Sequence, residues 1–358
     1  MLNLPEAPRA LRRMPFRDDL PMKRGLLRLL ARTGRRLESA FGPFEPVRAG
    51  PPVIEVYLGY ATPDHWIARG RVLSRLKRPQ ARHGQGPWRN LLQMLSLFLT
   101  DEVAEVTVTA PAHGVSAITD EEGYFNLLIP QSDARGWAEV AVEAEGAHAR
   151  LPVQIPNPRA RMAVVSDIDD TVIATGAWNL PRNLWTTLTG NIQSRHVFPD
   201  AVELLARLSE AGRNPVFFVS SSPWNLHAFL EGLFARAGLV RAPLFLRDLG
   251  IGELQEGPTS HGEHKGGVID RLMAANPGLP FWLVGDTGQH DAAIYAAVAA
   301  RHPGRVRRVT LRRAGRAAEA GAVAELRAQG IPVDLLDDYG PLLSELAEKK
   351  RELRATAP

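Results

Sequence analysis

The sequence predicts two folded parts: an all-β, sandwich-like domain over residues 51–157, followed by an α/β domain over 158–345. In the first part, short β-rich runs such as VIEVYLGY and AEVAVEAEG are separated by turn residues, which is typical of antiparallel sandwiches. In the second part, strand-like and helix-like segments alternate. This alternation favours a parallel sheet with helices on both faces. A charged tail is expected over 346–358.

The N-terminal segment, residues 1–50, differs from the rest of the chain in its charge. It holds 11 Lys and Arg against 5 Asp and Glu, a net charge of +6, whereas the remainder has a net charge of −2. Within it, residues 20–42 place Leu and Phe side chains on one stripe of a helix and arginines opposite. Such a helix can bind an anionic membrane surface or dock on the protein's own core, and both interpretations stay open.

Composition limits the class of protein. With 358 residues, 45% hydrophobic and 23% charged, the chain is typical of soluble globular proteins. No apolar run approaches the roughly 18 residues of a membrane span, and the first residues lack the pattern of a signal peptide. We therefore expect a cytoplasmic protein, with peripheral contact at the inner membrane surface through residues 20–42 as a hypothesis. The lack of cysteine excludes thiol catalysis and disulfides.

The stretch AVVSDIDDTVI, residues 163–173, crowds three carboxylates behind an apolar run. Asp167, Asp169 and Asp170 repel one another, and each raises its neighbours' pKa unless a cation or fixed donors offset the repulsion. The stretch therefore predicts a metal site. A calcium-binding EF-hand loop is excluded because Val172 occupies its glycine position and Trp178 its bidentate glutamate position. We expect Asp170 to cap a turn.

Four groups of polar residues follow four predicted strands in order. They are Asp167, Asp169 and Thr171 after the first strand, Ser220 after the second, Lys265 in the helix after the third, and Asp286 and Asp291 after the fourth. In open parallel sheets the functional site lies beyond the carboxyl ends of the strands. The sequence thus predicts that these groups meet in one site. The histidines of HGEH have i, i+3 spacing, unlike the zinc motif HExxH, so a zinc site is not favoured.

The segments DIDDT, FFVSSSP, HK and VGDTGQHD resemble motifs one to four of the haloacid dehalogenase superfamily, in its phosphatase branch. Over residues 160–312 the chain resembles more closely the catalytic domain of the actin-patch-associated phosphatidate phosphatase family and its bacterial relatives. The upstream GYATPDHWIARGRVL is similar to the bacterial members. The resemblance implies a Rossmann-like, haloacid dehalogenase-type catalytic domain with a small flap cap. It also implies Mg²⁺-dependent conversion of phosphatidate to diacylglycerol and phosphate.

The resemblance implies a role for each acid. Asp167 would attack phosphorus to form an aspartyl-phosphate, while Asp169 would protonate the leaving alkoxide and then activate water. The Asp167 carboxylate, the Asp169 main-chain carbonyl and Asp286 would hold Mg²⁺, and Asp291 would support the metal shell. Where the family pattern tends to read HDPEIY, this chain has HDAAIY; we expect the missing acid to matter little for the chemistry, although its loss could change the outer shell of the metal.

The resemblance also implies which residues bind the phosphoryl group. Ser220 and Lys265 would contact its oxygens, and Lys265 would offset the charge of Asp167. By the same resemblance, Thr171 of the first motif is also a candidate catalytic residue. Ser221 is a candidate for substrate binding, with local hydrogen bonding as the alternative for Ser221 and Ser222.

The segment 174–198, between the first two motifs, is longer than a plain turn and predicts a flap. Its Trp178 and Trp185 are candidates for substrate binding, because they could hold acyl chains or lie at a bilayer surface. They could equally pack the flap onto the protein. Only about 40 residues separate the second and third motifs, so no large cap fits there and the site should be open.

Two other functions remain open from the sequence. The same motifs serve phosphomonoesterases that act on a soluble phosphometabolite or a nucleic-acid end, and a non-catalytic membrane-binding module would use the acids only to bind metal. A nucleic-acid substrate is not favoured, because the basic excess lies far in sequence from Asp167. A phospholipid substrate is therefore the leading hypothesis, with Mg²⁺ as cofactor.

Overall fold

A computed structural model describes residues 52–74, 103–175, 196–247 and 261–355. The chain divides between Val47 and Arg48 into two units. The first unit, with the helix predicted over 20–42, lies outside the described residues, and so do the flap residues Trp178 and Trp185. Within the described ranges, no helix combines the length and the apolar character that crossing a membrane requires.

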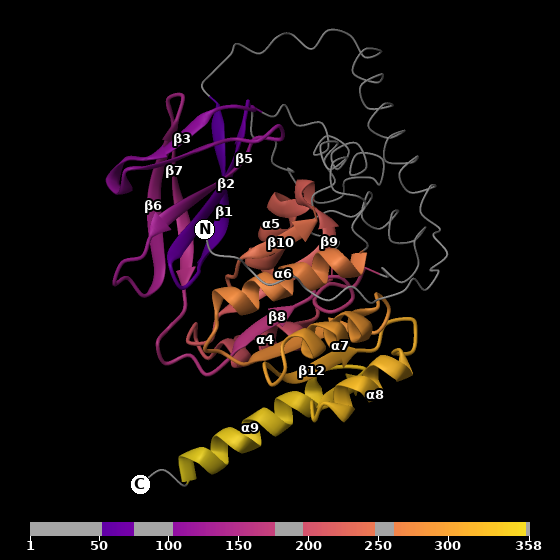
Figure 1. The fold of residues 1–358 in the computed structure, drawn as a ribbon. Coiled ribbons are helices and arrows are strands. Elements are labelled where there is room, and N and C mark those ends of the chain that lie inside the picture. Colours follow the sequence, from indigo (N-terminus) through magenta and orange to yellow (C-terminus); the bar gives the residue numbers. More distant parts are fainter. Residues whose placement is uncertain (1–51, 75–102, 176–195, 248–260, 356–358) are drawn as a thin grey trace, which may run out of the picture. The chain divides into compact units, whose positions relative to one another are not determined.

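The first part of the described chain is a seven-stranded sheet (Figure 1). Its strands are β1 (Val53–Ala61), β2 (His65–Leu73), β3 (Thr107–Ala110), β4 (Val115–Ile118), β5 (Tyr124–Pro130), β6 (Gly136–Ala144) and β7 (Ala147–Ile155), with the short helix η1 (Pro111–His113) between β3 and β4. The order is β4-β3-β6-β7-β1-β2-β5. Neighbours pair antiparallel, except that β1 and β7 pair parallel.

This arrangement differs from the two facing sheets that the sequence predicts. Strand β2 pairs with β1 on one edge and with β5 on the other, so the hydrogen-bonded ladder continues through all seven strands. The end strands β4 and β5 contact each other, so the sheet curls around a core. Alternating apolar residues supply that core, for example Val140, Val142 and Ala144 of β6. Short strands separated by turns lie where the sequence predicts them, whereas the pairing of β1 with β7 joins segments distant in sequence and carries no local signal.

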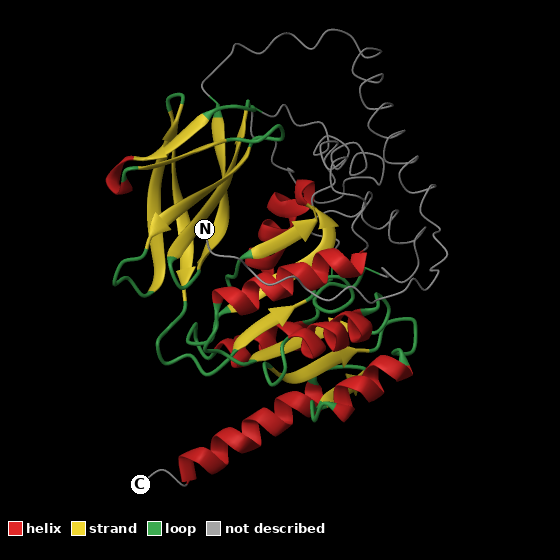
Figure 2. Ribbon diagram, viewed as in Figure 1, coloured by secondary structure: helices red, strands yellow, loops and turns green. Residues whose placement is uncertain are grey.

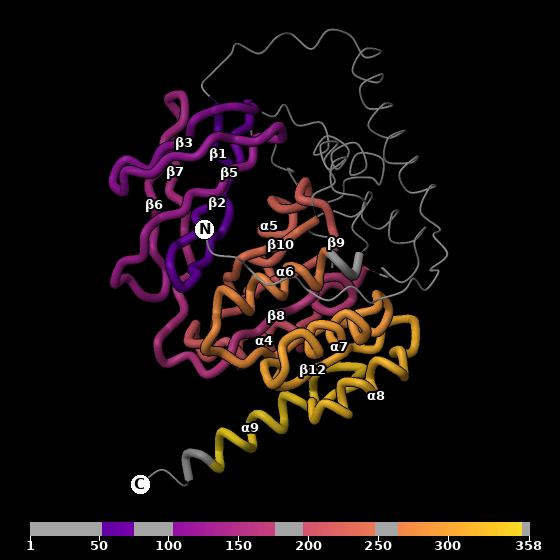
Figure 3. Tube along the Cα trace, viewed as in Figure 1, coloured from indigo at the N-terminus to yellow at the C-terminus, as the bar shows by residue number. Residues whose placement is uncertain are grey.

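The second part is a six-stranded sheet in which all neighbours are parallel (Figure 2). Its strands are β8 (Ala163–Ser166), β9 (Val216–Pro223), β10 (Leu244–Arg247), β11 (Phe281–Asp286), β12 (Val306–Arg312) and β13 (Val333–Leu336). The order is β10-β9-β8-β11-β12-β13, the order of doubly wound α/β sheets. Strand β8, the first of the six in sequence, therefore lies inside the sheet between β9 and β11. Figure 3 follows the chain from the seven-stranded sheet through β8 into this second part.

Helices bury both faces of the parallel sheet. They are α4 (Pro199–Ser209), α5 (His227–Ala237), α6 (His261–Ala275), α7 (Asp291–Arg301), α8 (Ala320–Ala328) and α9 (Gly340–Ala355), with the short helix η2 (Trp224–Leu226) before α5. One core joins the sheet to α4, α5 and α9, and a second joins it to α6, α7 and α8. Because strands β8, β9, β10 and β11 contribute residues to both cores, they are apolar without alternation, as in the buried VFFV of β9.

The C-terminal boundary differs from the expectation. Residues 346–355 continue helix α9 and do not form a separate tail. The ion pair between Lys349 and Glu345, one turn apart, stabilises the helix across the expected boundary. Leu342 and Leu343 of the same helix are buried in the core beneath α4. The charged sequence is therefore the solvent-exposed continuation of a packed helix.

Candidate active site

Three carboxylates meet at the carboxyl ends of two neighbouring parallel strands. Asp167 follows β8 directly, Asp286 is the last residue of β11, and Asp291 begins helix α7 after a short turn. One oxygen from each carboxylate lies within 4.8 Å of the others, and all three residues are buried. The first and fourth groups of the sequence prediction are thus brought together by the pairing of β8 with β11.

Lys265 lies among these acids. Its Nζ is 2.8 Å from Asp167 Oδ1 and also pairs with Asp291 Oδ1, with the side chain buried. Burial by itself lowers the pKa of Lys265, but the negative charge of the surrounding carboxylates outweighs this effect and raises the pKa well above its usual value. Lys265 is therefore a permanent cation at this site. Helix α6 carries it one turn after the first described helical residue, His261.

One ammonium does not neutralise three carboxylates. Burial, opposed by Lys265 and supported by the other acids, raises the pKa of Asp167 to about 8. Burial and the charges of Asp291 and Asp167 raise the pKa of Asp286 to about 9. Asp167 Oδ2 is also buried without a hydrogen-bond partner in the described part of the chain. An unpartnered carboxylate oxygen in an acidic cluster is the environment that a hard cation such as Mg²⁺ requires.

Asp291 differs from the other two acids because protein donors occupy both of its oxygens. Lys265 donates to Oδ1, and the Asp286 main-chain N–H donates to Oδ2 at 3.1 Å. A Cβ added to Gly285 would lie only 2.2 Å from Asp291 Oδ2, so the close approach of this carboxylate to strand β11 requires glycine. Asp291 thus orients the end of β11 and Lys265, which suits a supporting position beside the cluster.

The turn after β11 contributes a residue that the sequence did not single out. The main-chain N–H groups of Gly288 and Gln289 donate to Asp286 Oδ1 and thereby fix the position of that carboxylate. The side-chain Nε2 of Gln289 donates to the Asp169 main-chain oxygen at 3.1 Å. Gln289 thereby connects the first motif with the fourth. Its position within GDTGQHD was the only available signal.

Asp169 is held by two serines from the neighbouring strand β9. The hydroxyls of Ser220 and Ser222 donate to Asp169 Oδ2 at 2.9 and 2.8 Å. Ser222 N also donates to Ser220 Oγ, so the serines and the acid form one network. Ser222 therefore forms more than the local hydrogen bonds expected of it, because its hydroxyl donates to a residue 53 positions away. Ser221, between them, is half-buried on β9.

The remaining residues of the first motif shape the turn. Asp170 has a positive φ of 59°, and its Oδ1 accepts hydrogen bonds from Thr175 N and Oγ1, which is the expected turn cap. Thr171 is fully buried, and no described residue forms a hydrogen bond with its Oγ1. Its main-chain oxygen accepts a hydrogen bond from Tyr339 of the C-terminal segment at 3.4 Å. Thr171 thus lies behind the carboxylates.

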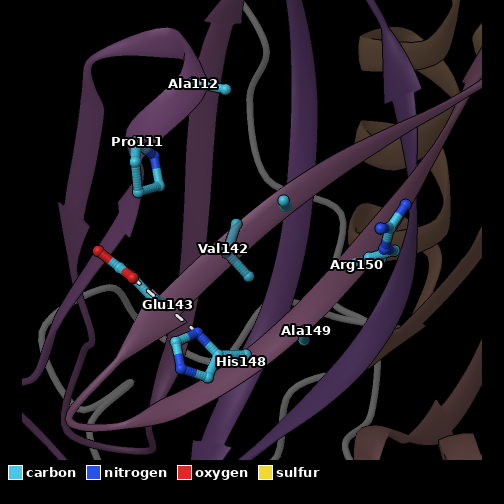
Figure 4. Close-up of a pocket in the computed structure, with 8 residues that line it drawn as sticks. Pro111, Ala112, Val142, Glu143, His148, Ala149 and Arg150 are labelled. Atoms are coloured by element: carbon cyan, nitrogen blue, oxygen red, sulfur yellow. Dashed lines mark ion pairs between the residues drawn. The ribbon is translucent and has the colours of Figure 1, made fainter.

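A separate pocket of about 580 Å³ lies on the seven-stranded sheet (Figure 4). Its lining includes Glu143 of β6 and His148 and Arg150 of β7. The His148 and Glu143 side chains form an exposed pair at 3.9 Å, marked by the dashed line in Figure 4. None of the acids of the cluster lines this pocket, and its charged groups are exposed to solvent. The acidic cluster is therefore the better candidate site.

Residues 162–313 match a family model described as phosphatidate phosphatase APP1, catalytic domain. A curated relative, phosphatidate phosphatase APP1 of Saccharomyces cerevisiae, is 28% identical over 153 residues, which cover 42% of this chain and 26% of that protein. An uncharacterized protein of Schizosaccharomyces pombe is 30% identical over 237 residues, or 61% of this chain and 37% of the relative. The chain thus spans well under half of the length of either relative.

Among solved structures, a carbohydrate acetylesterase from Xanthomonas citri covers 78% of this chain and 73% of its own chain, with 9% identity and a TM-score of 0.26. That likeness is too low to support an argument about the fold. The family match is more informative about the site. The matched segment begins just before β8, ends just after β12 and contains every acid of the cluster. The part of the chain that carries the acidic site is thus similar to the catalytic domain of the phosphatidate phosphatase APP1 family.

Proposed function

We propose that this protein is a Mg²⁺-dependent phosphatidate phosphatase with a haloacid dehalogenase-type catalytic domain. One observation carries the proposal: buried Asp167, with Lys265 on one oxygen and no partner on the other among the described residues, lies within the segment that matches the APP1 catalytic domain. The yeast relative is named a phosphatidate phosphatase, which supports a phospholipid as the substrate class. The catalytic chemistry below is argued from the residues of this chain.

The donor set fits Mg²⁺, which prefers oxygen ligands and keeps several of its own waters. Asp167, Asp286 and the Asp169 main-chain oxygen would hold the ion, and Asp291 would orient this set through Lys265 and the Asp286 amide. Gln289 Nε2, which donates to the Asp169 oxygen, would turn away or present its own oxygen. When bound, the ion supplies positive charge against the phosphoryl oxygens.

Asp167 is the proposed nucleophile. Its carboxylate oxygen forms a bond to phosphorus while the bond between phosphorus and the ester oxygen breaks, and Asp169 gives its proton to the departing diacylglycerol oxygen. Asp169 then takes a proton from water as that water attacks phosphorus, which releases phosphate and restores the Asp167 carboxylate. Both steps require the Asp169 carboxyl group to face the same side of the phosphoryl group, where the alkoxide leaves and the water then attacks. The hydrogen bonds from Ser220 and Ser222 provide that orientation.

Lys265 and Ser220 are the proposed contacts of the phosphoryl oxygens. Lys265 touches the Asp167 oxygen and thus lies beside any phosphorus that Asp167 attacks. Its fixed positive charge stabilises the charge that develops on the transferred group. Ser220 is the last fully buried residue of β9 before the strand reaches the site. Its hydroxyl can rotate from Asp169 toward a phosphoryl oxygen.

The test compares phosphate release from phosphatidate vesicles with release from a soluble monoester, with Mg²⁺ and with EDTA. The proposal expects Mg²⁺-dependent release from the vesicles and a loss of about 1,000-fold or more in Asp167→Asn. Asp133→Asn, at an exposed position in the connection between β5 and β6, is the matched control and should retain activity. Equal activity in Asp167→Asn would refute the mechanism.

The same assay tests the lipid substrate and the membrane contact. Deleting residues 1–42 should reduce vesicle binding and hydrolysis of vesicle phosphatidate, most at low ionic strength, and spare the soluble monoester. Such an outcome would support a cytoplasmic enzyme that reaches the membrane through its basic segment. Hydrolysis of soluble monoesters without activity on vesicles would replace the phospholipid with a soluble phosphometabolite as substrate.

A further inference from the structure

Arg69 of strand β2 is buried where the seven-stranded sheet contacts the parallel sheet. Its side chain is only 8% exposed, and its Nη2 donates to two main-chain oxygens. One is Leu58 O of β1 at 2.9 Å, and the other is Leu244 O of β10 at 3.0 Å. The guanidinium therefore bridges the two sheets through hydrogen bonds to both.

Aromatic rings complete the surroundings of Arg69. Its Cζ lies 4.6 Å from the ring centre of Phe245 in β10 and 5.6 Å from that of Trp224 in η2. Trp224 in turn stacks on Tyr57 of β1, with ring centres 4.8 Å apart and planes 27° apart. Tyr57 and Arg69 thus contact Trp224 from the seven-stranded sheet. Trp224 lies two residues after Ser222, which donates to Asp169.

No carboxylate pairs with Arg69 in the described ranges of the chain. Burial lowers its pKa to about 10, so the group keeps its charge at neutral pH. Burying a cation without an acidic partner is costly, because carbonyl dipoles and ring faces replace only part of its hydration. A simple apolar residue could pack two sheets together at less cost. The position of Arg69 therefore calls for a role beyond packing.

The contacts of Arg69 converge on the end of strand β9. Strand β10, whose Leu244 oxygen accepts from Arg69, pairs in register with β9 at Phe218 and Val219. Trp224 lies on the other side of the two serines, immediately after β9 ends. The serine hydroxyls are thus fixed from both directions by groups that touch Arg69. A displacement of either group would move the hydroxyls away from Asp169.

We propose that Arg69 is a positioning residue through which the seven-stranded sheet fixes the end of strand β9 that carries Ser220 and Ser222. Through Trp224 and Leu244 it holds Ser220 and Ser222 where their hydroxyls orient Asp169. The upstream sheet is then a working part of the phosphatase and not only an appended module. This inference rests on the proposed function for its kinetic consequence, whereas its structural consequence can be measured without turnover.

The experiment uses the full chain with Arg69→Met, which removes the charge, and Arg69→Lys, which keeps it. With a soluble monoester, Arg69→Met should lower kcat by between about 10-fold and 100-fold, with KM changed much less, because orientation of Asp169 matters in the transition state. Arg69→Lys should recover part of the lost kcat. If Arg69→Met is too unstable to purify, Trp224→Leu takes its place, because it removes the ring that contacts Arg69 directly after β9. It should lower kcat to a similar extent.

Arg305→Met is the matched control. Like Arg69, the half-buried Arg305 donates to main-chain oxygens, those of Met273, Asn276 and Leu279, and lies over an aromatic ring, that of Phe281. It should affect the thermal midpoint as Arg69→Met does but leave kcat within about threefold of the wild type. A purely structural role of Arg69 predicts instead that the two arginine variants behave alike.

Hydrogen exchange separates this inference from the proposed function. In Arg69→Met, exchange should increase at residues 220–227 and stay unchanged at the Asp286 turn. If the wild type has no phosphatase activity but this local increase occurs, the proposed function fails and the positioning role stands. Unchanged exchange at 220–227, or a kcat equal to the wild type, would overturn the positioning role.

Discussion

Two buried cations, Lys265 and Arg69, are stabilised in opposite ways. Lys265 lies between Asp167 and Asp291, and these carboxylates raise its pKa despite burial. Arg69 lies among main-chain oxygens and aromatic rings, and burial lowers its pKa to about 10. The first cation is outnumbered by acids, whereas the second is not matched by any acid in the described part of the chain.

The comparison shows how two kinds of unfavourable burial can be interpreted. An excess of acidic groups indicates a site of chemistry, whereas a cation held by main-chain oxygens indicates that it positions other groups. The acidic cluster holds three carboxyl groups against one ammonium, and one carboxylate oxygen has no partner among the described residues, so ionising all three acids becomes favourable only when a cation joins them. Arg69 Nη2 donates to main-chain oxygens of two different strands, an arrangement that fixes geometry, while its buried Nε has no partner among the described residues. We therefore expect substitutions at the acid cluster to change chemistry first.

The largest expected effect on stability is at Lys265. Lys265→Met leaves Asp167 and Asp291 buried without their common cation, which should cost about 3–5 kcal/mol of unfolding free energy. Turnover should fall by at least about 100-fold, because the charge that stabilises the phosphoryl oxygens is lost. Urea titration and phosphate release measure the two effects.

Lys349→Met is the control for Lys265→Met. Lys349 forms an exposed pair with Glu345 one turn away, a pair worth only about 0.3–0.5 kcal/mol. Similar losses of stability in the two lysine variants would mean that the buried contacts of Lys265 contribute nothing specific.

A smaller effect of opposite sign is expected at Asp286 in metal-free protein. Burial and neighbouring acids raise the folded-state pKa of Asp286 to about 9, so at pH 7–8 folding requires this carboxyl to take up a proton that it lacks in the unfolded chain, and this requirement opposes folding at every pH above the unfolded pKa. Asp286→Asn removes this requirement and should stabilise the protein at pH 7–8 by on the order of 1–2 kcal/mol in EDTA. The same variant should lose the rise in thermal midpoint that Mg²⁺ gives the wild type. A wild type that Mg²⁺ does not stabilise would argue against the metal site.

Gly285 tests how closely Asp291 approaches the sheet. Gly285→Ala would place a Cβ 2.2 Å from Asp291 Oδ2, and relief of this overlap should cost about 1–3 kcal/mol. Activity should fall as Asp291 moves away from Lys265. Gly278→Ala is the matched control, because its Cβ would meet no atom within 4 Å. Equal thermal midpoints for the two variants would show that the turn after β11 can relax freely.

The smallest expected effect lies at helix α9, far from both buried cations in the chain. Hydrogen bonds from Arg308 and then Lys349 lower the pKa of Glu345 to about 2. A carboxylate with a lowered folded-state pKa stabilises the fold above its unfolded pKa, and this contribution is lost as the pH falls from about 4.5 toward 2. Because Glu345 is partly exposed, the contribution should be on the order of 0.5 kcal/mol. Glu345→Gln should remove this component from the acid unfolding profile, and an identical profile would exclude it.

The sequence predicted the parts of the site that depend on strand ends. Asp167 and Asp286 end neighbouring parallel strands, and the alternation of strands and helices is enough to bring such residues to one edge. The turn cap was predictable because Asp residues that follow a strand commonly accept hydrogen bonds within the next turn, as Asp170 does from Thr175 N.

Other features depend on contacts that no local pattern encodes. Ser222 reaches Asp169 across 53 positions, and Arg69 reaches Leu244 across 175. In HWIARGRVL, Arg69 looks like an ordinary surface arginine of a strand, and only the docking of β10 makes it buried. The single curled sheet depends in the same way on the pairing of β1 with β7.

The central claim is that Asp167 itself forms a bond to phosphorus, and trapping that bond tests it most directly. In Asp169→Asn with Mg²⁺ and p-nitrophenyl phosphate, the leaving group needs no proton, so the first step should proceed while hydrolysis by water is slowed. Acid quenching followed by peptide mass spectrometry should then locate one phosphoryl group on Asp167 in a large share of the molecules. Phosphate release that continues with no label on Asp167, or with the label on another residue, would contradict the account.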